Sequence, residues 1–316
     1  MSVPVLDTAA WAEKLMSLPR SGAANVTAFY EHRMGGICRD VRFLLVPLDD
    51  HMVHRGDAIF ESLSFIDGRI IQLDAHLARM KNSAARLELA PPCSWEEIRA
   101  AMLDTARAGG ERFGGLKVLL GRGMGGLGVD PKECSESSLY IVATKSRPLP
   151  EEYWQKGLTA ARSSVPAKQE WLAQIKSTNY LANAIMAKEA REKGVGLTFS
   201  FDERGFLAEG AIANVAMIDR EGRMLMPEFR HALPGTTALL AAELAKSFRP
   251  VVITEITEEI LEQAAERLVL GTTCECVAVT HYDGKPVGDG RPGPIADRLR
   301  HMLHEALVTG GVPFLE

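Results

Sequence analysis

The spacing of hydrophobic and polar residues changes from segment to segment in the first half of the chain. Residues 8–19 have the spacing of a short helix, and apolar runs at residues 41–46 and 59–65 predict strands. Asp-Gly at residues 67–68 is typical of a hairpin turn directly after the second run. A helix capped by Asp74 is expected next, because apolar residues then recur at intervals of three and four. These residues are Leu77, Met80, Ala84 and Leu87.

A second helix and a pair of strands complete the first half. Ser94 is a suitable cap for a helix that reaches about residue 107. Apolar segments at residues 116–120 and 139–144 are expected to pair as strands. The polar segment at residues 145–152 contains two prolines, and we interpret it as a linker between two domains.

Shorter strands alternate irregularly with helices in the second half. Strands are expected at residues 158–163, 197–201, 206–208, 214–219, 224–226, 267–270 and 276–281. Helices are expected at residues 179–193, 237–246, 258–266 and 293–308. In the first of these helices we expect Leu181, Ile185 and Met186 to point inward and Gly194 to end the helix. Because hairpins are frequent, the pattern predicts an α+β fold with antiparallel-rich sheets, in a smaller domain (1–148) and a larger one (149–316).

Composition narrows the class of protein. The net charge is −5 and no long basic run occurs, which argues against nucleic acid or an anionic membrane as a partner. No apolar stretch approaches the length of a membrane span, and the first residues lack the pattern of a secretory signal. The five cysteines are sparse and include no C-x-x-C pair, so we expect reduced thiols and a cytoplasmic protein.

Two motifs resemble a metal site and a dinucleotide-binding loop, but a simpler interpretation fits each of them. Cys274-Glu-Cys276 has the alternation of a strand with two buried thiols on one face, and we expect no metal there. Gly121, Gly123 and Gly126 satisfy G-x-G-x-x-G, but no helix can begin within this glycine run and the next strand ends without an acid. We therefore reject a nicotinamide cofactor and interpret the loop as a flexible wall of some site.

Lys176 and Glu209 are the first candidates for chemistry. A lysine with an ordinary pKa must spend about 5 kcal/mol to be neutral at pH 7, and burial or an imine avoids that cost. Trp171 and Ile175 give Lys176 apolar neighbours, although most lysines near helix starts are simply solvated. Glu209 ends an apolar strand and precedes a buried-looking run, so it needs an arginine or a protonated ring nitrogen as partner.

A candidate anion site accompanies them. Gly235, Thr236 and Thr237 lie at a helix start, where free amides and hydroxyls face an anion, unless they form only an ordinary cap. Arg79 lies beside an apolar stripe, and Gly-Thr-Thr-Cys-Glu at residues 271–275 forms a second hydroxyl-rich turn. A lysine, a buried acid and a phosphate cradle in one chain are the requirements of a pyridoxal phosphate enzyme.

The same motifs, taken as an ordered set, resemble the class IV aminotransferases. The similarity extends over about residues 45–305, and residues 49–61 look most like a subgroup that contains plant proteins described as D-amino acid aminotransferase or lyase. The motifs are His76 with Arg79; Lys176, Ser177 and Asn179; Glu209, Gly210 and Asn214; Leu-Pro-Gly-Thr-Thr at 233–237; and the turn at 271–275.

The resemblance implies fold type IV, with two domains, a pyridoxal 5'-phosphate site between them, and a homodimer whose partner supplies pocket loops. It implies that Lys176 carries the cofactor and moves the substrate proton, and that Glu209 keeps the pyridine nitrogen charged. Tyr180 would lie near the ring hydroxyl. The remaining cofactor-binding residues that it implies, several of them for the phosphate, are Arg79, Asn214, Gly235, Thr236, Thr237 and Thr272.

The substrate stays open at this stage. The D-amino acid enzymes and the lyase carry an arginine for a substrate carboxylate in the loop where this chain has Leu127. That loop and the turn at residues 271–275 resemble the branched-chain enzymes, while the segment at Lys176 is closer to the D-amino acid enzymes and the lyase. Arg55 and Arg122 are cations that could replace the missing one, and Phe60 and Thr273 are also expected near the substrate. We expect transamination between a small or medium, apolar amino acid and a 2-oxo acid. The alternatives are an aminodeoxychorismate lyase, which releases pyruvate and 4-aminobenzoate, and a non-catalytic binding protein.

Overall fold

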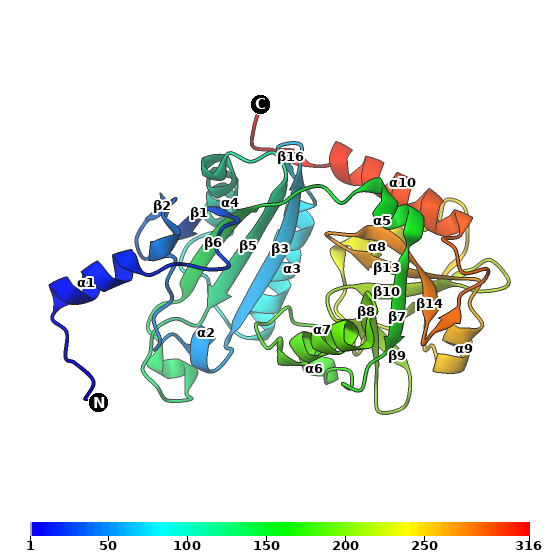
Figure 1. Cartoon of the computed structure of the whole chain (residues 1–316), viewed down its shortest axis with the longest axis horizontal. Coiled ribbons are helices and arrows are strands. Elements are labelled where there is room, and N and C mark those ends of the chain that lie inside the picture. The colour runs from blue at the N-terminus through cyan, green and yellow to red at the C-terminus, as the bar shows by residue number, and fades with distance from the viewer. Residues whose placement is uncertain (1) are drawn as a thin grey trace.

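Two β-sheets organise residues 2–316, which the computed structural model describes. Figure 1 shows one sheet in the half of the molecule coloured mainly from blue to sea green and the other in the half coloured from green to orange. The first sheet has seven strands in the order β16-β4-β3-β5-β6-β1-β2. Its strands are β1 (Val26–Glu31), β2 (Gly36–Cys38), β3 (Ala58–Ile66), β4 (Arg69–Ile70), β5 (Gly114–Gly121), β6 (Ser138–Lys145) and β16 (Val312–Pro313).

One face of the first sheet is covered by α3 (Leu73–Arg86) and α4 (Trp95–Gly109). Side chains alternate along β3, so that Ile59 and Leu63 join this core while Phe60 and Ser62 belong to the opposite face. That opposite face is turned toward the second sheet and supplies one wall of a cavity.

The second sheet closes on itself. It has nine strands, and β9 pairs with both β8 and β10, so β10, β13, β14, β7, β8 and β9 form a ring. Pairing is mostly antiparallel, with parallel pairs at β11–β12, β14–β7 and β7–β8. The strands are β7 (Leu158–Arg162), β8 (Leu197–Phe201), β9 (Leu207–Gly210), β10 (Asn214–Ile218), β11 (Met224–Pro227), β12 (Val251–Thr254), β13 (Glu266–Gly271), β14 (Glu275–Tyr282) and β15 (Lys285–Pro286).

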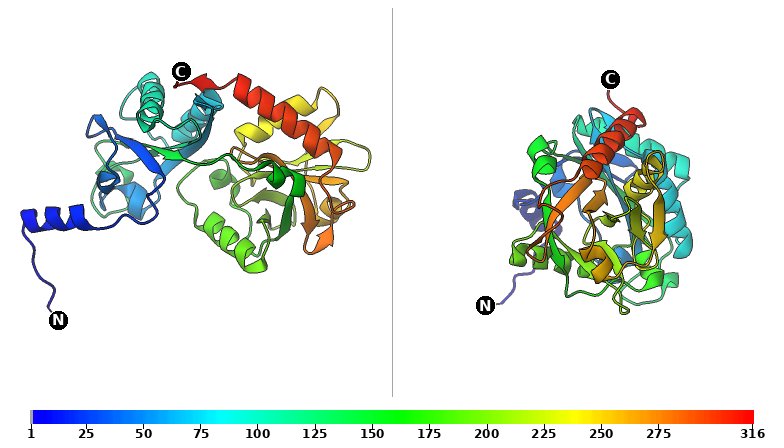
Figure 2. Two further views of the ribbon diagram at one scale, coloured as in Figure 1. Left: turned by 45° about the horizontal axis from the view of Figure 1, so that its top comes forward. Right: turned by 90° about the vertical axis from the view of Figure 1, so that its right-hand side faces the viewer.

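Each face of these strands has its own core. Ala216 and Leu268 pack beneath α8 (Thr236–Ala245) and α10 (Pro294–Thr309), while Val215 and Val269 contribute to a separate cluster. Figure 2 shows α10 lying along the second half before the chain returns to the first sheet as β16, and α1 projecting away from the rest. The other helices are α1 (Thr8–Ser17), α2 (His51–His54), α5 (Glu151–Lys156), α6 (Glu170–Ala173), α7 (Leu181–Lys193) and α9 (Glu258–Glu262).

The predicted α+β class with antiparallel-rich sheets is confirmed. Ser94 caps α4 in a capping box with Glu97, and residues 67–68 form the predicted hairpin turn, both with positive φ. The predicted boundary after residue 148 falls in the segment between β6 and α5, and it stays a prediction. Within residues 2–316, no helix combines the length and apolar composition that a membrane span requires.

Two local predictions in the first half are wrong. Residues 41–46 form a short 3₁₀ turn, Val41–Phe43, and irregular chain, because no neighbouring strand of the described residues pairs with them and Phe43 remains half-exposed. Asp74 lies in the first turn of α3, whose cap position is held by Gln72 in the left-handed region, without a side-chain hydrogen bond.

The predicted orientation of α7 is also wrong in part. Met186 is buried, but Leu181 is 74% exposed and Ile185 is 42% exposed. The helix instead turns Asn183, Met186 and Ala190 inward. Because this face includes a polar residue and a small one, the spacing of large apolar residues does not predict it.

The two thiols of Cys-Glu-Cys are buried, as predicted, but they do not share a face. Glu275, the first residue of β14, has a φ of 56°, which breaks the alternation between the two thiols. Cys274 therefore packs in one core cluster and Cys276 in the other.

Candidate active site

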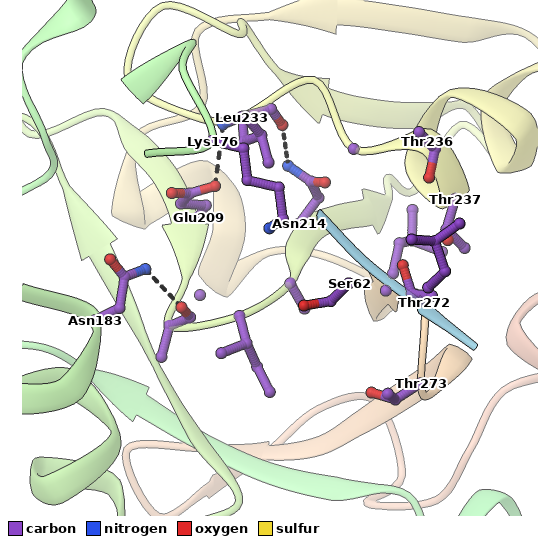
Figure 3. A pocket seen from close by; sticks show the side chains of 18 of the residues that line it. Ser62, Lys176, Asn183, Glu209, Asn214, Leu233, Thr236, Thr237, Thr272 and Thr273 are labelled. Carbon is purple, nitrogen blue, oxygen red and sulfur yellow. Dashed lines mark hydrogen bonds between the residues drawn. The ribbon is translucent and has the colours of Figure 1, made fainter. Parts of the chain in front are cut away.

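A cavity of about 330 Å³ lies between the two sheets. β3 and β5 supply its wall from the first sheet, and β9, β10, α7, α8 and the turn before β14 supply most of the wall from the second half. Arg79 of α3 and the segment that contains Lys176 and Tyr180 also line it. Figure 3 shows Lys176 and Glu209 near one end and the threonines of α8 near the other. The cavity brings together every residue that the sequence predicted for cofactor binding: Arg79, Lys176, Tyr180, Glu209, Asn214, Gly235, Thr236, Thr237 and Thr272.

Lys176 is held by the edge of β3. Its carbonyl accepts a hydrogen bond from the Phe60 amide at 2.8 Å, and the Thr178 amide donates to Ala58 at 2.9 Å. The Nζ atom lies 3.2 Å from the Tyr180 hydroxyl and 4.6 Å from the centre of the Phe60 ring. Burial and the Arg79 charge lower the pKa of Lys176 to about 8, which brings the neutral amine within reach at physiological pH.

Glu209 is the penultimate residue of the apolar strand β9, and its side chain is 12% exposed. Its Oε2 atom accepts a hydrogen bond of 3.0 Å from the Leu233 amide, which is drawn in Figure 3. Burial raises the pKa of Glu209 more than the nearby cations lower it. The carboxylate is therefore a strong acceptor that gains from any additional donor in the cavity.

Lys168 is a neighbour of Glu209 that the sequence analysis missed. Its Nζ atom lies 3.9 Å from Glu209 Oε1 and 4.6 Å from the centre of the Tyr180 ring. Burial lowers the pKa of Lys168, although the Glu209 charge opposes this effect. No motif marks Lys168, because the chain brings it to Glu209 only when the segment before α6 is held against β8, where the Ala167 amide donates to the Phe201 carbonyl.

The start of α8 forms the other end of the cavity. Its first amides have no partner within the helix, and Thr237 Oγ1 is buried without a hydrogen-bond partner in residues 2–316. Asn214 fixes the preceding loop by donating to the Leu233 carbonyl at 2.8 Å. A Cβ atom at Gly235 would lie 2.0 Å from Asn214 Oδ1, so this close approach requires glycine. Free amides and an unpartnered hydroxyl at a helix N-terminus are suited to holding an anion.

A buried carboxylate orients Arg79 toward this end. Glu61 accepts hydrogen bonds of 2.8 and 2.6 Å from Arg79 and one of 2.7 Å from His76 Nδ1. His76 Nε2 in turn lies 3.2 Å from Thr236 Oγ1. Burial raises the pKa of Glu61, but the hydrogen bonds from Arg79 and His76 outweigh it and lower the pKa. His76 stood in the sequence motif, whereas Glu61 had no predicted role.

The predicted substrate residues divide into two groups. Phe60 and Thr273 line the cavity, whereas Arg55, Arg122 and Leu127 do not. Arg55 donates to the carbonyls of Leu127 and Gly128. Arg122 forms an ion pair with Asp57 at 2.8 Å. Within residues 2–316, the glycine-rich loop does not line this cavity, and its predicted role as a wall of some site stays a prediction.

Known proteins share both the sequence and the architecture. The family model Amino-transferase class IV matches residues 58–282. A chloroplastic D-amino-acid transaminase of Arabidopsis thaliana is 32% identical over 98% of this chain and 83% of its own. The branched-chain-amino-acid aminotransferase of Escherichia coli (strain K12) is 27% identical over 84% of this chain and 88% of its own. A branched-chain amino acid aminotransferase of T.th., solved with pyridoxamine 5'-phosphate, is 26% identical and covers 90% of this chain and 95% of its own, with a TM-score of 0.84.

Proposed function

The chain belongs to the class IV aminotransferases, and from that premise we propose that it moves an amino group between an amino acid of the branched-chain or D-amino acid type and a 2-oxo acid, with pyridoxal 5'-phosphate as cofactor. One observation carries the proposal: Lys176, Glu209 and the start of α8, far apart in sequence, line one cavity. The relatives named above are transaminases, so the lyase alternative is not favoured.

The residues present fit this cofactor. Arg79 and the start of α8, with the unpartnered Thr237 hydroxyl, would hold the phosphate. Glu209 would accept a hydrogen bond from the ring nitrogen, and Lys176 would hold the cofactor covalently. When bound, the cofactor supplies an electron sink for negative charge at the substrate α-carbon.

Lys176 is suited to moving the proton of the substrate α-carbon. With a pKa of about 8, the neutral amine costs about 1 kcal/mol at pH 7, against about 5 kcal/mol for an ordinary lysine. Tyr180 lies within hydrogen-bonding distance of Nζ and restricts where the amine points. Catalysis by a positioned base contributes typically 10²–10⁴-fold to a rate.

Glu209 would hold a proton between its carboxylate and the ring nitrogen. The Leu233 amide fixes the Oε2 atom of this carboxylate and so restricts its orientation in the cavity. Glu61 would act at the opposite end by orienting Arg79 and, through His76, Thr236. This chain of contacts would hold the phosphate donors in place before the cofactor arrives.

The homodimer and the cytoplasmic location are parts of the same proposal. Ile212 lines the cavity and is 78% exposed, and Leu181 and Ile185 on α7 are also exposed. Exposed apolar side chains at the mouth of a site support a covering second copy. The cysteines are free, which is compatible with a reducing compartment, although the Arabidopsis relative is chloroplastic.

A panel of amino donors and acceptors tests the function. L- and D-alanine, valine, leucine, glutamate and aspartate are each incubated with 2-oxoglutarate or pyruvate, beside aminodeoxychorismate. We expect amino transfer from an apolar donor, because the buried side chains of Phe60, Leu63 and Ala211 give the cavity apolar surface that leaves a second carboxylate without a partner. Pyruvate release from aminodeoxychorismate, with no transfer to any 2-oxo acid, would contradict the aminotransferase proposal.

A further inference from the structure

Lys168 is a largely buried cation that lies beside the cavity without lining it. Its side chain is 14% exposed, and its Nζ atom is 3.9 Å from Glu209 Oε1 and 4.6 Å from the centre of the Tyr180 ring. Among residues 2–316, Glu209 is the carboxylate with which Lys168 forms an ion pair. Because 3.9 Å is too long for a direct hydrogen bond, the ammonium group acts on the carboxylate through its charge.

One short segment, residues 228–235 between β11 and α8, contacts both members of this ion pair. The His231 Nδ1 atom lies 2.8 Å from the carbonyl oxygen of Lys168, and because that oxygen can only accept, His231 is the donor. Two residues later, the Leu233 amide donates to Glu209 Oε2 at 3.0 Å. On its other side, His231 Nε2 faces Asp202 at 3.9 Å. The segment therefore holds the backbone of Lys168 and the carboxylate of Glu209 in a fixed relation.

Three cations influence the Glu209 carboxylate, and two of them are engaged when the cofactor is bound. Burial raises the pKa of Glu209, and the Lys168 charge is the strongest of the influences that oppose this, ahead of the charges of Lys176 and Arg79. Lys176 gives up its ammonium group when it holds the cofactor covalently. Arg79 is paired with Glu61 at 2.6 Å. In the loaded protein Lys168 is therefore the cation, within residues 2–316, that is left to stabilise the charge of Glu209.

We propose that Lys168 is a positioning residue that keeps Glu209 ionised and thereby keeps the ring nitrogen of the bound cofactor protonated, an inference that rests on the proposed function. A carboxylate and a pyridine nitrogen in contact share one proton. A cation beside the carboxylate stabilises its negative charge and so favours the arrangement with the proton on nitrogen. The protonated ring withdraws electrons more strongly, so Lys168 would act on the reaction through Glu209, without contact with the substrate.

NMR of pyridoxal 5'-phosphate labelled with ¹⁵N at the ring nitrogen tests this inference, because the chemical shift of that atom reports whether it is protonated. Wild type, Lys168→Met and Lys168→Arg are loaded with the labelled cofactor and titrated with pH, and the free cofactor at low and high pH supplies the two reference shifts. At neutral pH the wild type should lie near the protonated reference. Lys168→Met should lose the ring proton at a pH lower by about 1 to 3 units, the effect of an opposite charge at this distance. Lys168→Arg should follow the wild type, because it restores the charge.

Two further variants are controls for the titration. Glu209→Gln has no carboxylate and gives the shift of a ring nitrogen without this acceptor. Lys188→Met removes a charge from α7 that is 61% exposed, and it should titrate as the wild type does. Lys168→Met should fold, because the hydrogen bond between His231 and residue 168 uses the backbone carbonyl, which the substitution keeps. Lys168→Gln, which also removes the charge, replaces it if circular dichroism shows that the methionine variant is unfolded.

A ring nitrogen that titrates in Lys168→Met as it does in the wild type would overturn the inference. So would a Lys168→Arg protein that titrates like Lys168→Met, because the charge would then not be the cause, and so would a wild type whose ring nitrogen is unprotonated at neutral pH. Failure of the proposed function has a different signature: the wild type would not retain the labelled cofactor, or it would retain the cofactor and transfer no amino group in the donor panel.

Discussion

Replacing Lys176 with methionine should stabilise the cofactor-free protein at neutral pH. Lys176 is mostly buried, and burial together with the Arg79 charge lowers its pKa from 10.5 to about 8. Each pKa unit corresponds to about 1.4 kcal/mol, so keeping the charged lysine in the folded chain costs about 3 kcal/mol. Methionine fills a similar space without a charge and removes this cost.

The stabilisation should depend on pH in a defined direction. Below pH 8 the lysine is protonated in both states, and the full cost is present. Between pH 8 and 10.5 the unfolded chain binds the proton more tightly than the folded chain, so the stability of the wild type rises with pH. The advantage of Lys176→Met should therefore be largest near pH 7 and should disappear toward pH 10.5.

Urea unfolding of both cofactor-free proteins from pH 6 to 10 measures this difference, and contributions of other titrating groups cancel between them. Lys188→Met is the matched control, because Lys188 on α7 is 61% exposed and its loss reports the removal of a surface charge. A Lys176→Met protein that is less stable than wild type at pH 7, or a difference that is constant with pH, would refute the reasoning.

Three further substitutions test the site. Glu209→Gln should keep the fold and lower turnover on the order of a hundredfold, or about 3 kcal/mol of barrier, and near-normal turnover would show that the charge is unnecessary. Arg79→Ala should weaken cofactor affinity in an absorbance titration far more than the rate of the saturated enzyme, and the opposite pattern would show that its role is misassigned. Glu61→Gln should lower the free energy of unfolding in urea by about 3 kcal/mol, because Arg79 and His76 lose their buried counter-charge; unchanged stability would show that the network is dispensable.

The elements that were predicted correctly are determined by interactions between residues that are close in sequence. Ser94 and Glu97 form a capping box within four residues, and Gly194 ends α7 because it adopts the left-handed region. The predicted strand at residues 41–46 failed because its apolar residues find no pairing strand in the described chain. Leu181 is exposed for a related reason: the orientation of α7 follows its packing on β8, which the residues of α7 alone do not determine.

The residues of the candidate site also fall into two groups: those that a local motif predicts and those that only the packing of distant segments brings together. Lys176, Glu209 and the start of α8 lie in recognisable motifs, and the structure places them in one cavity. Lys168 and Lys117 have no motif. Lys168 reaches Glu209 only because the segment before α6 is held against β8, and Lys117 faces the cavity only because of its register opposite Ser62. Such contacts depend on pairings between distant segments, which local sequence patterns do not encode.

Borohydride reduction of the cofactor-loaded protein, followed by peptide mapping with mass spectrometry, tests the central claim most directly. The account predicts that the cofactor becomes permanently attached to the peptide that contains Lys176, because this amine combines a lowered pKa with a place inside the cavity. Attachment at Lys168 or Lys117, or a protein that binds the cofactor without any lysine being labelled, would contradict it.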